Sequence, residues 1–426
     1  MNNSFIGPAI EYPFVWLLDL AFPMISKLAL NIESVEITDE DKKMLRGLQN
    51  KRLLYSSNHP TTIEPPVSFF VANAMGSRFH FMASRAVFEW GYGLVGEMIK
   101  KVGAFSVLSG GLDRDSVKMA RNILSSKKGK LVIYPEGMNS NENDNLLPFQ
   151  AGAIQIAFWA LEDAMKKEKD PDINILPAFV KYKLTWSTNR LKSHITDSIK
   201  KIETHLNVDH GERNLLRRFL FVGRIILENT EKEYSIIPDE ASGFDYRIGK
   251  VRHTALNRAA ENIGITLSDK MDAIEKLKEL FTTLESFELG FPLPKHPGLK
   301  IPKNKIPLIK KDIEKAYTFL VIRPEYLVSR PTPERFIEWL TRFETLLFGK
   351  SDFRPRKAIL SFSEPISLLE NYGNYKSNKK LTVEKLNNKL RDTIEDMMIK
   401  SIPLSDPIVE PFDAGPDLKV FGINKK

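Results

Sequence analysis

A histidine and a carboxylate lie close together in the sequence, directly behind an apolar run. His59 and Glu64 are separated by four residues, and Leu53-Leu54-Tyr55 precedes them. Histidine has an unperturbed pKa of about 6.5, so its neutral form accepts a proton near neutral pH. A carboxylate on the other ring nitrogen orients the ring and stabilises the imidazolium that forms. The pair therefore suits a general base with an orienting acid, although a turn-capping histidine beside a solvated acid is the alternative.

Prolines lie within this pair and directly after it. Pro60 fits the first turn of a helix or a tight loop, and Pro65-Pro66 oppose regular helix directly after Glu64. We therefore expect His59 and Glu64 to share one compact turn at the end of a strand formed by residues 53–57. Loops held by a rigid strand commonly carry reactive residues.

Three further sequence blocks follow in order. They are Gly103-Ala104-Phe105-Ser106-Val107 leading to Asp113-Arg114, then Val132-Ile133-Tyr134-Pro135-Glu136-Gly137, then Ile175-Leu176-Pro177-Ala178-Phe179. With Asn58 and His59, this order resembles the glycerolipid acyltransferase family, which includes lysophosphatidate acyltransferases. That family shows an Asn-His-x4-Asp block, a Gly-x-Phe block leading to an Arg, a Phe-Pro-Glu-Gly block and an apolar-Pro block.

The resemblance implies a role for each matching residue. His59 and Glu64 are the catalytic pair, with His59 removing the proton of an acceptor hydroxyl as that hydroxyl attacks a thioester. Arg114, Glu136 and Gly137 place the acceptor, and Asn58 and Gly103 complete the expected substrate-binding set.

Two of these residues also have an interpretation without a role in substrate binding. Arg114 follows Asp113, a residue suited to cap a helix, so an exposed first-turn residue is the other interpretation. Glu136 is otherwise the solvated acid of a strand-to-loop turn. The glycine-rich residues 109–111 are expected to fold over a bound ligand.

The sequence departs from the family pattern at two places. Glu64 stands where the family has Asp, which adds one methylene, and Met138-Asn139-Ser140 stand where the family has Thr-Arg-Ser. The second change removes a cation from the acceptor region, so a phosphorylated alcohol, a neutral alcohol and an amine all remain open as acceptors.

Composition narrows the chemistry further. The chain has no cysteine, which excludes thiol catalysis, disulfides and thiolate metal sites. Its formal net charge of +8 indicates an anionic partner. We expect an anionic membrane surface, an acyl thioester donor (acyl-coenzyme A or acyl carrier protein) and a glycerolipid acceptor. No cofactor, metal or nucleic acid is expected, because the histidines show no ligand spacing and no nucleic-acid motif occurs.

The 426 residues divide into four expected segments. Residues 1–50 form N-terminal amphipathic helices, broken at Pro23, that contact a membrane through Trp16 and Phe22 or pack on the core. Residues 51–186 form the acyltransferase core, 187–354 a helical insertion, and 355–426 the strand and helix that complete the core. The predicted fold class is α/β, a mixed sheet flanked by helices with an inserted, mainly helical region.

These observations predict an O-acyltransferase. It would move a fatty acyl group from a thioester to a glycerolipid such as 1-acyl-glycerol-3-phosphate, in phospholipid biosynthesis or remodelling. Its expected location is peripheral, on the cytoplasmic face of a membrane. The alternative is a non-catalytic lipid- or membrane-binding protein that retains the acyltransferase fold.

Overall fold

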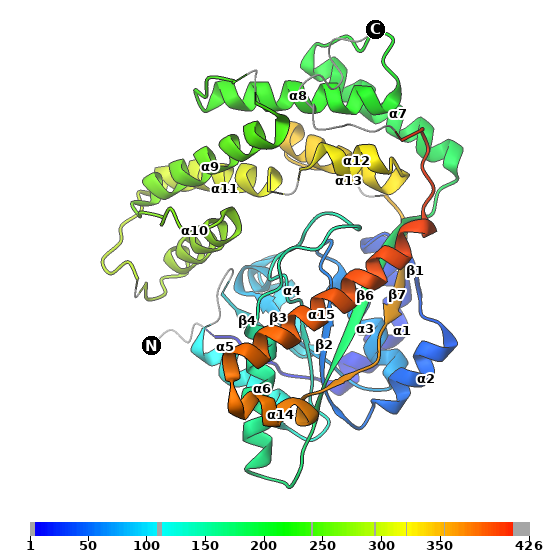
Figure 1. Cartoon of the computed structure of the whole chain (residues 1–426), viewed down its shortest axis with the longest axis vertical. Coiled ribbons are helices and arrows are strands. Elements are labelled where there is room, and N and C mark those ends of the chain that lie inside the picture. The colour runs from blue at the N-terminus through cyan, green and yellow to red at the C-terminus, as the bar shows by residue number, and fades with distance from the viewer. Residues whose placement is uncertain are drawn as a thin grey trace. The chain divides into compact units, whose positions relative to one another are not determined.

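The computed structural model describes residues 5–108, 113–239, 242–293, 295–320, 322–352 and 354–411. They form two units, which Figure 1 colours along the chain. The sheet unit contains the described residues up to Thr185 together with Pro355–Leu404. The helical unit contains Trp186–Arg354 and the described residues from Ser405 onward.

An eight-stranded mixed sheet forms the centre of the sheet unit. Its strand order is β1-β7-β6-β2-β5-β3-β4, and β8 pairs with β6. The strands are β1 (Ile32–Glu36), β2 (Arg52–Ser57), β3 (His80–Ser84), β4 (Ala104–Val107), β5 (Lys130–Ile133), β6 (Ile173–Leu184), β7 (Arg356–Phe362) and β8 (Ile366–Ser367). The predicted α/β class with a mixed sheet is confirmed.

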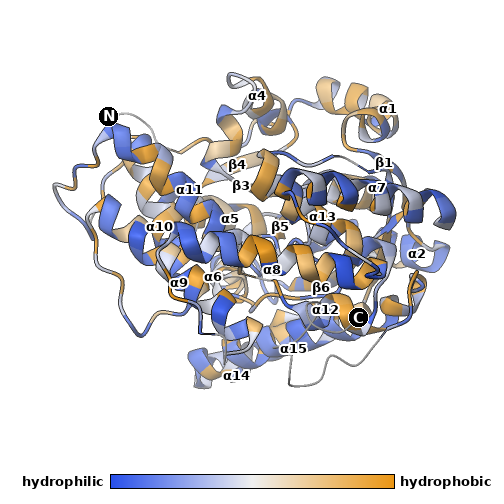
Figure 2. Ribbon diagram, turned by 90° about the horizontal axis from the view of Figure 1, so that it is seen from above, coloured by the Kyte–Doolittle hydropathy of each residue, from blue (hydrophilic) through white to orange (hydrophobic). Residues whose placement is uncertain are grey.

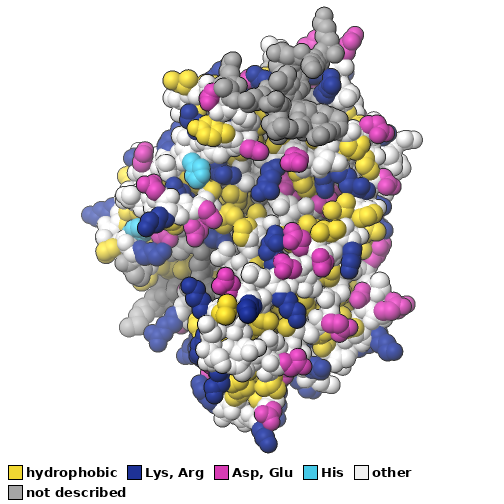
Figure 3. All heavy atoms as spheres, in the orientation of Figure 1, with side chains coloured by type: hydrophobic (Ala, Val, Ile, Leu, Met, Phe, Trp, Pro, Cys, Tyr) yellow, Lys and Arg dark blue, Asp and Glu magenta, His cyan; other side chains and the backbone are white. Residues whose placement is uncertain are grey.

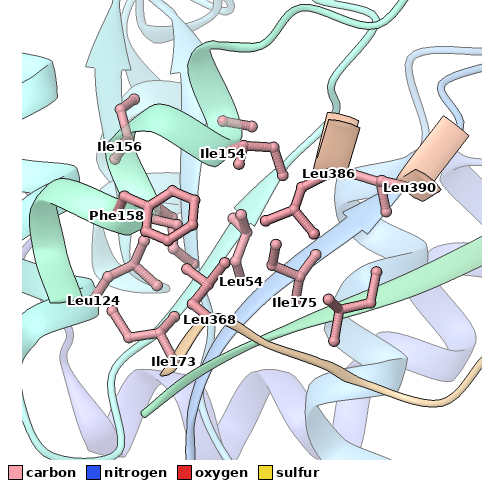
Figure 4. Close-up of a cluster of buried hydrophobic side chains, with 14 of the residues drawn as sticks. Leu54, Leu124, Ile154, Ile156, Phe158, Ile173, Ile175, Leu368, Leu386 and Leu390 are labelled. Atoms are coloured by element: carbon pink, nitrogen blue, oxygen red, sulfur yellow. The ribbon is translucent and has the colours of Figure 1, made fainter. Parts of the chain in front are cut away.

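Helices cover both faces of this sheet. The helices of the unit are α1 (Tyr12–Ala29), α2 (Asp39–Gly47), α3 (Glu64–Met75), α4 (Leu94–Lys101), α5 (Arg114–Ser125), α6 (Gly152–Met165), α14 (Leu368–Ser377) and α15 (Lys379–Ser401), with 3-10 turns η1 (Arg85–Glu89) and η3 (Ile402–Leu404). Alternation along β2 assigns them to faces. Leu54 packs with residues of α5, α6, α14 and α15 (Figure 4), whereas Leu53 and Tyr55 pack with residues of α2 and α3.

The direction of the strands determines where a site can form. Strands β2, β3, β4, β5 and β6 all run parallel to their neighbours among these five. Their carboxyl ends therefore meet at one edge, where ligands bind in open α/β sheets. Because β2 pairs with β6 only from Ile173 to Ala178, the last residues of β6 project beyond the end of β2.

The N-terminal segment differs from its prediction. Residues 12–29 form one helix that continues through Pro23, and β1 follows it as an edge strand paired with β7. Phe22 is buried against Phe69 and Phe70, so it is not a membrane anchor, whereas the side of α1 that carries Trp16 is exposed. The hydrogen bond lost at Pro23 is tolerated because Val15 and Phe22, before the proline, and Ile25, after it, pack in one cluster with Phe69 and so hold both halves of α1.

The described residues of the helical unit form helices joined by loops, and they include no strand. The helices are α7 (Thr188–Leu206), α8 (Leu215–Glu233), α9 (Phe244–Ile263), α10 (Ala273–Glu288), α11 (Ile306–Thr318), α12 (Pro324–Ser329) and α13 (Pro333–Phe348), with a 3-10 turn η2 (Lys303–Lys305). Two buried, bidentate ion pairs join neighbouring helices. Arg218 of α8 bonds Glu203 of α7, and Arg247 of α9 bonds Glu231 of α8.

The end of the chain corrects the expected boundary at residue 426. After η3 the chain joins the helical unit, where Arg330 donates a hydrogen bond to the Ser405 carbonyl at 2.9 Å and the Ile408 amide donates to the Pro331 carbonyl at 3.0 Å. The sheet is therefore completed by Pro355–Leu404 and not by the whole segment 355–426.

The distribution of surface charge and the apolar length of the helices bear on how the protein could meet a membrane. On the face shown in Figure 3, basic and acidic side chains are interspersed, and the positive charge is not gathered in one patch. No helix among the described residues is long and apolar enough to cross a membrane.

Candidate active site

His59 and Glu64 meet at the carboxyl edge of the sheet. The Nδ1 atom of His59 lies 2.6 Å from Oε2 of Glu64. His59 follows the end of β2, and Glu64 is the first residue of α3, with Pro65 and Pro66 in the first helical turn. Amides in that turn have no intrahelical partner, so prolines are tolerated there. His59 therefore lies in the expected turn, whereas Glu64 belongs to α3, so a helix rather than a loop fixes the carboxylate.

Four donors surround the Glu64 carboxylate. Besides His59, Oε2 accepts the Thr61 amide at 3.1 Å, while Oε1 accepts the Thr61 hydroxyl at 2.6 Å and the Tyr182 hydroxyl at 2.7 Å. Glu64 is buried, with 1% of its surface exposed. Burial alone would raise its pKa, but the interactions with His59, Thr61 and Tyr182 outweigh burial and lower the pKa below its usual value. The side chain is therefore an ionised, fixed partner for His59.

Sequence reasoning missed both Thr61 and Tyr182. Thr61 and Glu64 have the Ser/Thr-x-x-Glu spacing at which two such side chains can bond, although α3 begins at Glu64 with Ile63 at its N-cap position, so the two residues do not form a capping box. Tyr182 has no local signal, because it reaches Glu64 only from the part of β6 that projects beyond β2. Burial and the neighbouring carboxylate raise the pKa of Tyr182 well above 10, so its hydroxyl keeps the proton that it donates.

The His59 ring is held on its face as well as at its edge. It stacks on the Tyr134 ring with centroids 4.4 Å apart and an angle of 17° between the planes. The Tyr134 hydroxyl is in turn hydrogen bonded to Ser68 at 2.9 Å. The side chain of His59 is 19% exposed, and no described residue bonds its Nε2 atom. Nε2 is consequently the atom that can meet a substrate proton.

Glu136 bridges two loops of backbone. One carboxylate oxygen accepts the His59 amide at 2.7 Å, and the other accepts the Leu147 amide at 2.7 Å. Burial raises the pKa of Glu136 to about 7, although these two bonds act in the opposite direction. The described contacts make Glu136 a clamp on the His59 loop, whereas the sequence predicted contact with the acceptor.

Asn58 also holds the backbone. Its side chain accepts the Val180 amide at 2.8 Å and donates to the Val180 carbonyl at 3.0 Å. Asn143 does the same at Tyr182, with 2.9 Å and 3.2 Å. These two amides replace the missing strand beside the projecting part of β6, and so fix Tyr182. Asn58, predicted to bind substrate, is placed here as a structural support.

The turn after β5 supplies the remaining predicted residue of this region. Gly137 is exposed and adopts a φ of 72°, which favours glycine, and its amide donates to the Tyr134 carbonyl at 3.1 Å. Further along, the Ser140 amide donates to the His59 carbonyl at 2.9 Å. Asn139, where the family has Arg, donates to Asn141 at 3.0 Å. The turn therefore leaves Gly137 accessible beside a well-bonded loop.

Arg114 and Gly103 occupy opposite edges of the sheet. Arg114 is the exposed first residue of α5, behind Asp113, which caps the helix by accepting the Ser116 amide at 2.8 Å. Because α5 follows β4, it starts at the carboxyl edge, where His59 also lies. Residues 109–112, which include the predicted glycine-rich cover, lie outside the described residues.

Gly103 precedes β4 and so lies at the amino edge, away from His59. Its φ is 101°, and a Cβ there would come within 2.9 Å of the Phe79 carbonyl oxygen. The close approach that the glycine permits is to a neighbouring strand, and the structure does not bring it to the site. Among the described residues, no cluster of three His, Asp or Glu side chains could hold a metal ion.

Comparison with protein families gives one match. Residues 35–181 match the family model described as Acyltransferase. The matched range runs from β1 to β6 and contains His59, Glu64, Arg114 and Glu136, but it excludes the helical unit. No curated protein and no solved structure matches the chain.

Proposed function

From the premise that residues 35–181 are an acyltransferase domain of the glycerolipid acyltransferase family, we propose that the chain is an O-acyltransferase acting on lipids. It moves a fatty acyl group from acyl-coenzyme A or acyl carrier protein to the hydroxyl of a glycerolipid such as 1-acyl-glycerol-3-phosphate. The reaction belongs to phospholipid biosynthesis or remodelling. The thioester is a co-substrate, and the proposal includes no further cofactor.

The chemistry assigned to His59 follows from its geometry. Nε2 accepts the proton of the acceptor hydroxyl while the oxygen attacks the thioester carbonyl and forms the new C–O bond. The tetrahedral intermediate then expels the thiolate, which takes the proton back from the imidazolium. Glu64 stays ionised throughout, since four donors already fix it. General base catalysis of this kind contributes about 10²–10⁴ in rate.

One observation carries this proposal above all others. Nδ1 of His59 is committed to a buried carboxylate, while Nε2 has no partner among the described residues and 19% of the side chain is exposed. A histidine that merely capped a turn would not need a carboxylate held by Thr61 and Tyr182 behind it. The alternative, a lipid-binding protein without catalysis, does not require Glu64 to be held ionised against His59.

Arg114 is the proposed contact for an anionic acceptor. It is exposed, it opens α5 at the carboxyl edge, and the N-terminus of a helix adds favourable potential for a phosphate. A guanidinium also binds phosphate in a bidentate manner. The acceptor we propose is therefore phosphorylated, despite Asn139 at the position of the family's other cation.

The proposed location is peripheral, on the cytoplasmic surface of an anionic membrane. Support comes from large apolar side chains that α1 and the segment from η1 to α4 leave exposed. Figure 2 shows the hydrophobic residues along these elements in orange. On α1 these are Trp16, Leu17, Leu20, Met24 and Leu28, and on the second segment they are Trp90, Tyr92, Leu94 and Met98. The two segments are joined where the Ala9 and Glu11 amides donate to the Lys100 and Lys101 carbonyls. Surfaces of this composition bind lipid interfaces.

The membrane proposal has its own test. Replacing Leu20 and Leu28 by serine should weaken cosedimentation with phosphatidylglycerol vesicles at least tenfold. The matched control is Leu381→Ser, since Leu381 is also an exposed leucine, with 45% of its surface accessible. Equal sedimentation of the double variant and the control would remove the support that α1 gives.

Acyl transfer is tested by turnover of purified protein. Radiolabelled acyl-coenzyme A and acyl-acyl carrier protein are offered with lysophosphatidate, glycerol 3-phosphate and a neutral monoacylglycerol. Transfer to a phosphorylated acceptor is expected, and Arg114→Gln should raise KM for that acceptor while leaving KM for the neutral one unchanged. Binding of vesicles without transfer in any combination would favour the non-catalytic alternative.

A further inference from the structure

The tyrosine that stacks on His59 lies where it can act on the charge of the imidazole. Tyr134 directly follows β5, and its ring centroid lies 4.4 Å from that of His59, with 17° between the two planes. A general base becomes an imidazolium during the reaction, and here that cation would lie over the face of a phenol ring. A cation over an aromatic face, within about 6 Å of the centroid, is attracted by the negative charge of the π system. The stack therefore favours the protonated imidazole over the neutral one.

One helix holds both the edge and the face of the imidazole. Ser68 follows Glu64 by four residues on α3, so the two side chains lie on the same side of the helix. Glu64 bonds Nδ1 of His59 at 2.6 Å, and Ser68 bonds the Tyr134 hydroxyl at 2.9 Å. Both α3 residues are buried. The stack is therefore fixed by the same rigid element that fixes the carboxylate.

The Tyr134 ring meets His59 as a neutral phenol. Burial and the neighbouring Tyr55 and Glu64 raise the pKa of Tyr134 well above 10, so its hydroxyl keeps the proton. Because that hydroxyl is bonded to Ser68, the face of the ring and not the hydroxyl contacts the imidazole. Phenylalanine should therefore replace tyrosine here without loss of the effect, whereas an aliphatic side chain should not.

We propose that Tyr134 is a positioning residue for acyl transfer, whose ring face stabilises the His59 imidazolium as the acceptor hydroxyl loses its proton. The inference rests on the proposed function, in which His59 is the base. No bond forms or breaks at Tyr134. The proton passes from the acceptor oxygen to Nε2 and then to the departing thiolate, and Tyr134 acts only on the charged intermediate of that transfer.

Two substitutions separate the ring from its hydroxyl. Tyr134→Phe should keep kcat within twofold of the parent value, whereas Tyr134→Leu should lower kcat about fivefold or more, with KM for the acceptor unchanged. Tyr372→Leu is the matched control, since Tyr372 of α14 also stacks on an aromatic ring, that of Tyr375, with centroids 6.2 Å apart. The control should leave kcat unchanged.

A graded series changes the charge of the ring face while keeping its shape. Phenylalanine analogues with increasing numbers of ring fluorine atoms replace Tyr134 in the full chain, because fluorine withdraws electrons from the π face and adds little volume. Diethyl pyrocarbonate, which reacts with neutral imidazole, is applied from pH 5 to 8, and the peptide that contains His59 is quantified by mass spectrometry. The pH of half-maximal labelling should fall stepwise with added fluorine, since the imidazolium loses its stabilising contact.

Other titratable groups surround the two rings. Glu64 of α3 faces Nδ1 and is ionised, while Tyr182 of β6 and Tyr55 of β2 have raised pKa values and stay protonated from pH 5 to 8. Glu136 accepts the His59 amide, and its pKa is raised to about 7, inside the range of the experiment. The fluorinated series is therefore repeated in Glu136→Gln, where the same stepwise fall is expected.

The labelling needs no turnover, so its result does not depend on acyl transfer. A stepwise fall in a protein that transfers no acyl group would count against the proposed function and not against the stack. The inference is overturned if the labelling midpoint is constant across the fluorinated series, or if Tyr134→Leu, at an unchanged melting temperature, retains the kcat of Tyr134→Phe. Because the fluorinated rings preserve the packing of phenylalanine, the series decides the question even if Tyr134→Leu does not fold.

Discussion

Replacing Glu64 by glutamine isolates the effect of one charge. The side chains have the same shape, and the surrounding donors dictate how glutamine must sit. Oε2 accepts the fixed Thr61 amide and His59 Nδ1, so the glutamine oxygen should take that position. Its amide nitrogen then faces the hydroxyls of Thr61 and Tyr182, which rotate to accept. The variant should therefore keep both the fold and the tautomer of His59.

What the substitution removes is the attraction between a carboxylate and the imidazolium of the transition state. At a separation of roughly 4 Å and an effective dielectric constant of about 20, that attraction is about 4 kcal/mol. Since about 1.4 kcal/mol corresponds to a tenfold change in rate, kcat should fall about 10³-fold. KM should change little, because the acceptor meets Nε2 and not Glu64.

The assay is steady-state acyl transfer with the best donor and acceptor pair, with thermal melting recorded for each variant. Glu97→Gln is the control, since that glutamate is 66% exposed and pairs only with the nearby Lys100 in the described contacts. A kcat for Glu64→Gln within tenfold of the parent value, at an unchanged melting temperature, would refute the proposed role of the carboxylate.

Three other substitutions test the supports of the site. Tyr182→Phe removes one donor to a buried carboxylate, so the free energy of unfolding should fall by about 1.5–3 kcal/mol in urea denaturation, and no change would exclude the Glu64 contact. Glu136→Gln tests the raised pKa. Because the folded pKa of about 7 exceeds the ordinary value of 4.5, the parent protein should lose stability relative to the variant as pH rises from 4.5 to about 7, by about 3 kcal/mol in total. Melting curves of both proteins at pH 5 and 8 measure this, and a constant difference would show that the clamp does not titrate. Gly103→Ala should destabilise the sheet unit by about 1–2 kcal/mol at its positive φ, with KM unchanged, whereas Gly373→Ala, which has open space around it, should not destabilise; a raised KM for Gly103→Ala alone would restore its predicted substrate role.

The sequence contains enough information for the strands and for the central pair. Buried apolar runs with acids or histidines directly behind them identify β2 and β5, and the parallel arrangement then brings His59 and Glu136 to one edge. The sequence also predicts that a strand after the helical insertion completes the sheet, and this strand is β7, residues 356–362. These features depend on local composition and on one general rule of α/β topology.

Other parts depend on contacts between distant residues. Nothing near Tyr182 indicates that it bonds a carboxylate 118 positions away, because that contact exists only where β6 projects beyond β2. Glu136 and Asn58 have the residue types of ligand-binding groups, yet both are used by the backbone. The expectation that Pro65 and Pro66 oppose helix is wrong, because both lie in the first turn of α3, where proline is tolerated.

The most direct test of the account is the single-turnover rate of acyl transfer by His59→Ala. With the thioester and acceptor at saturating concentrations, the account predicts a rate about 10²–10⁴ below that of the parent protein, at an unchanged melting temperature. His205→Ala serves as the control, since His205 lies on α7 of the helical unit. A folded His59→Ala protein that transfers acyl groups as fast as the parent would contradict the assignment of His59 as the base.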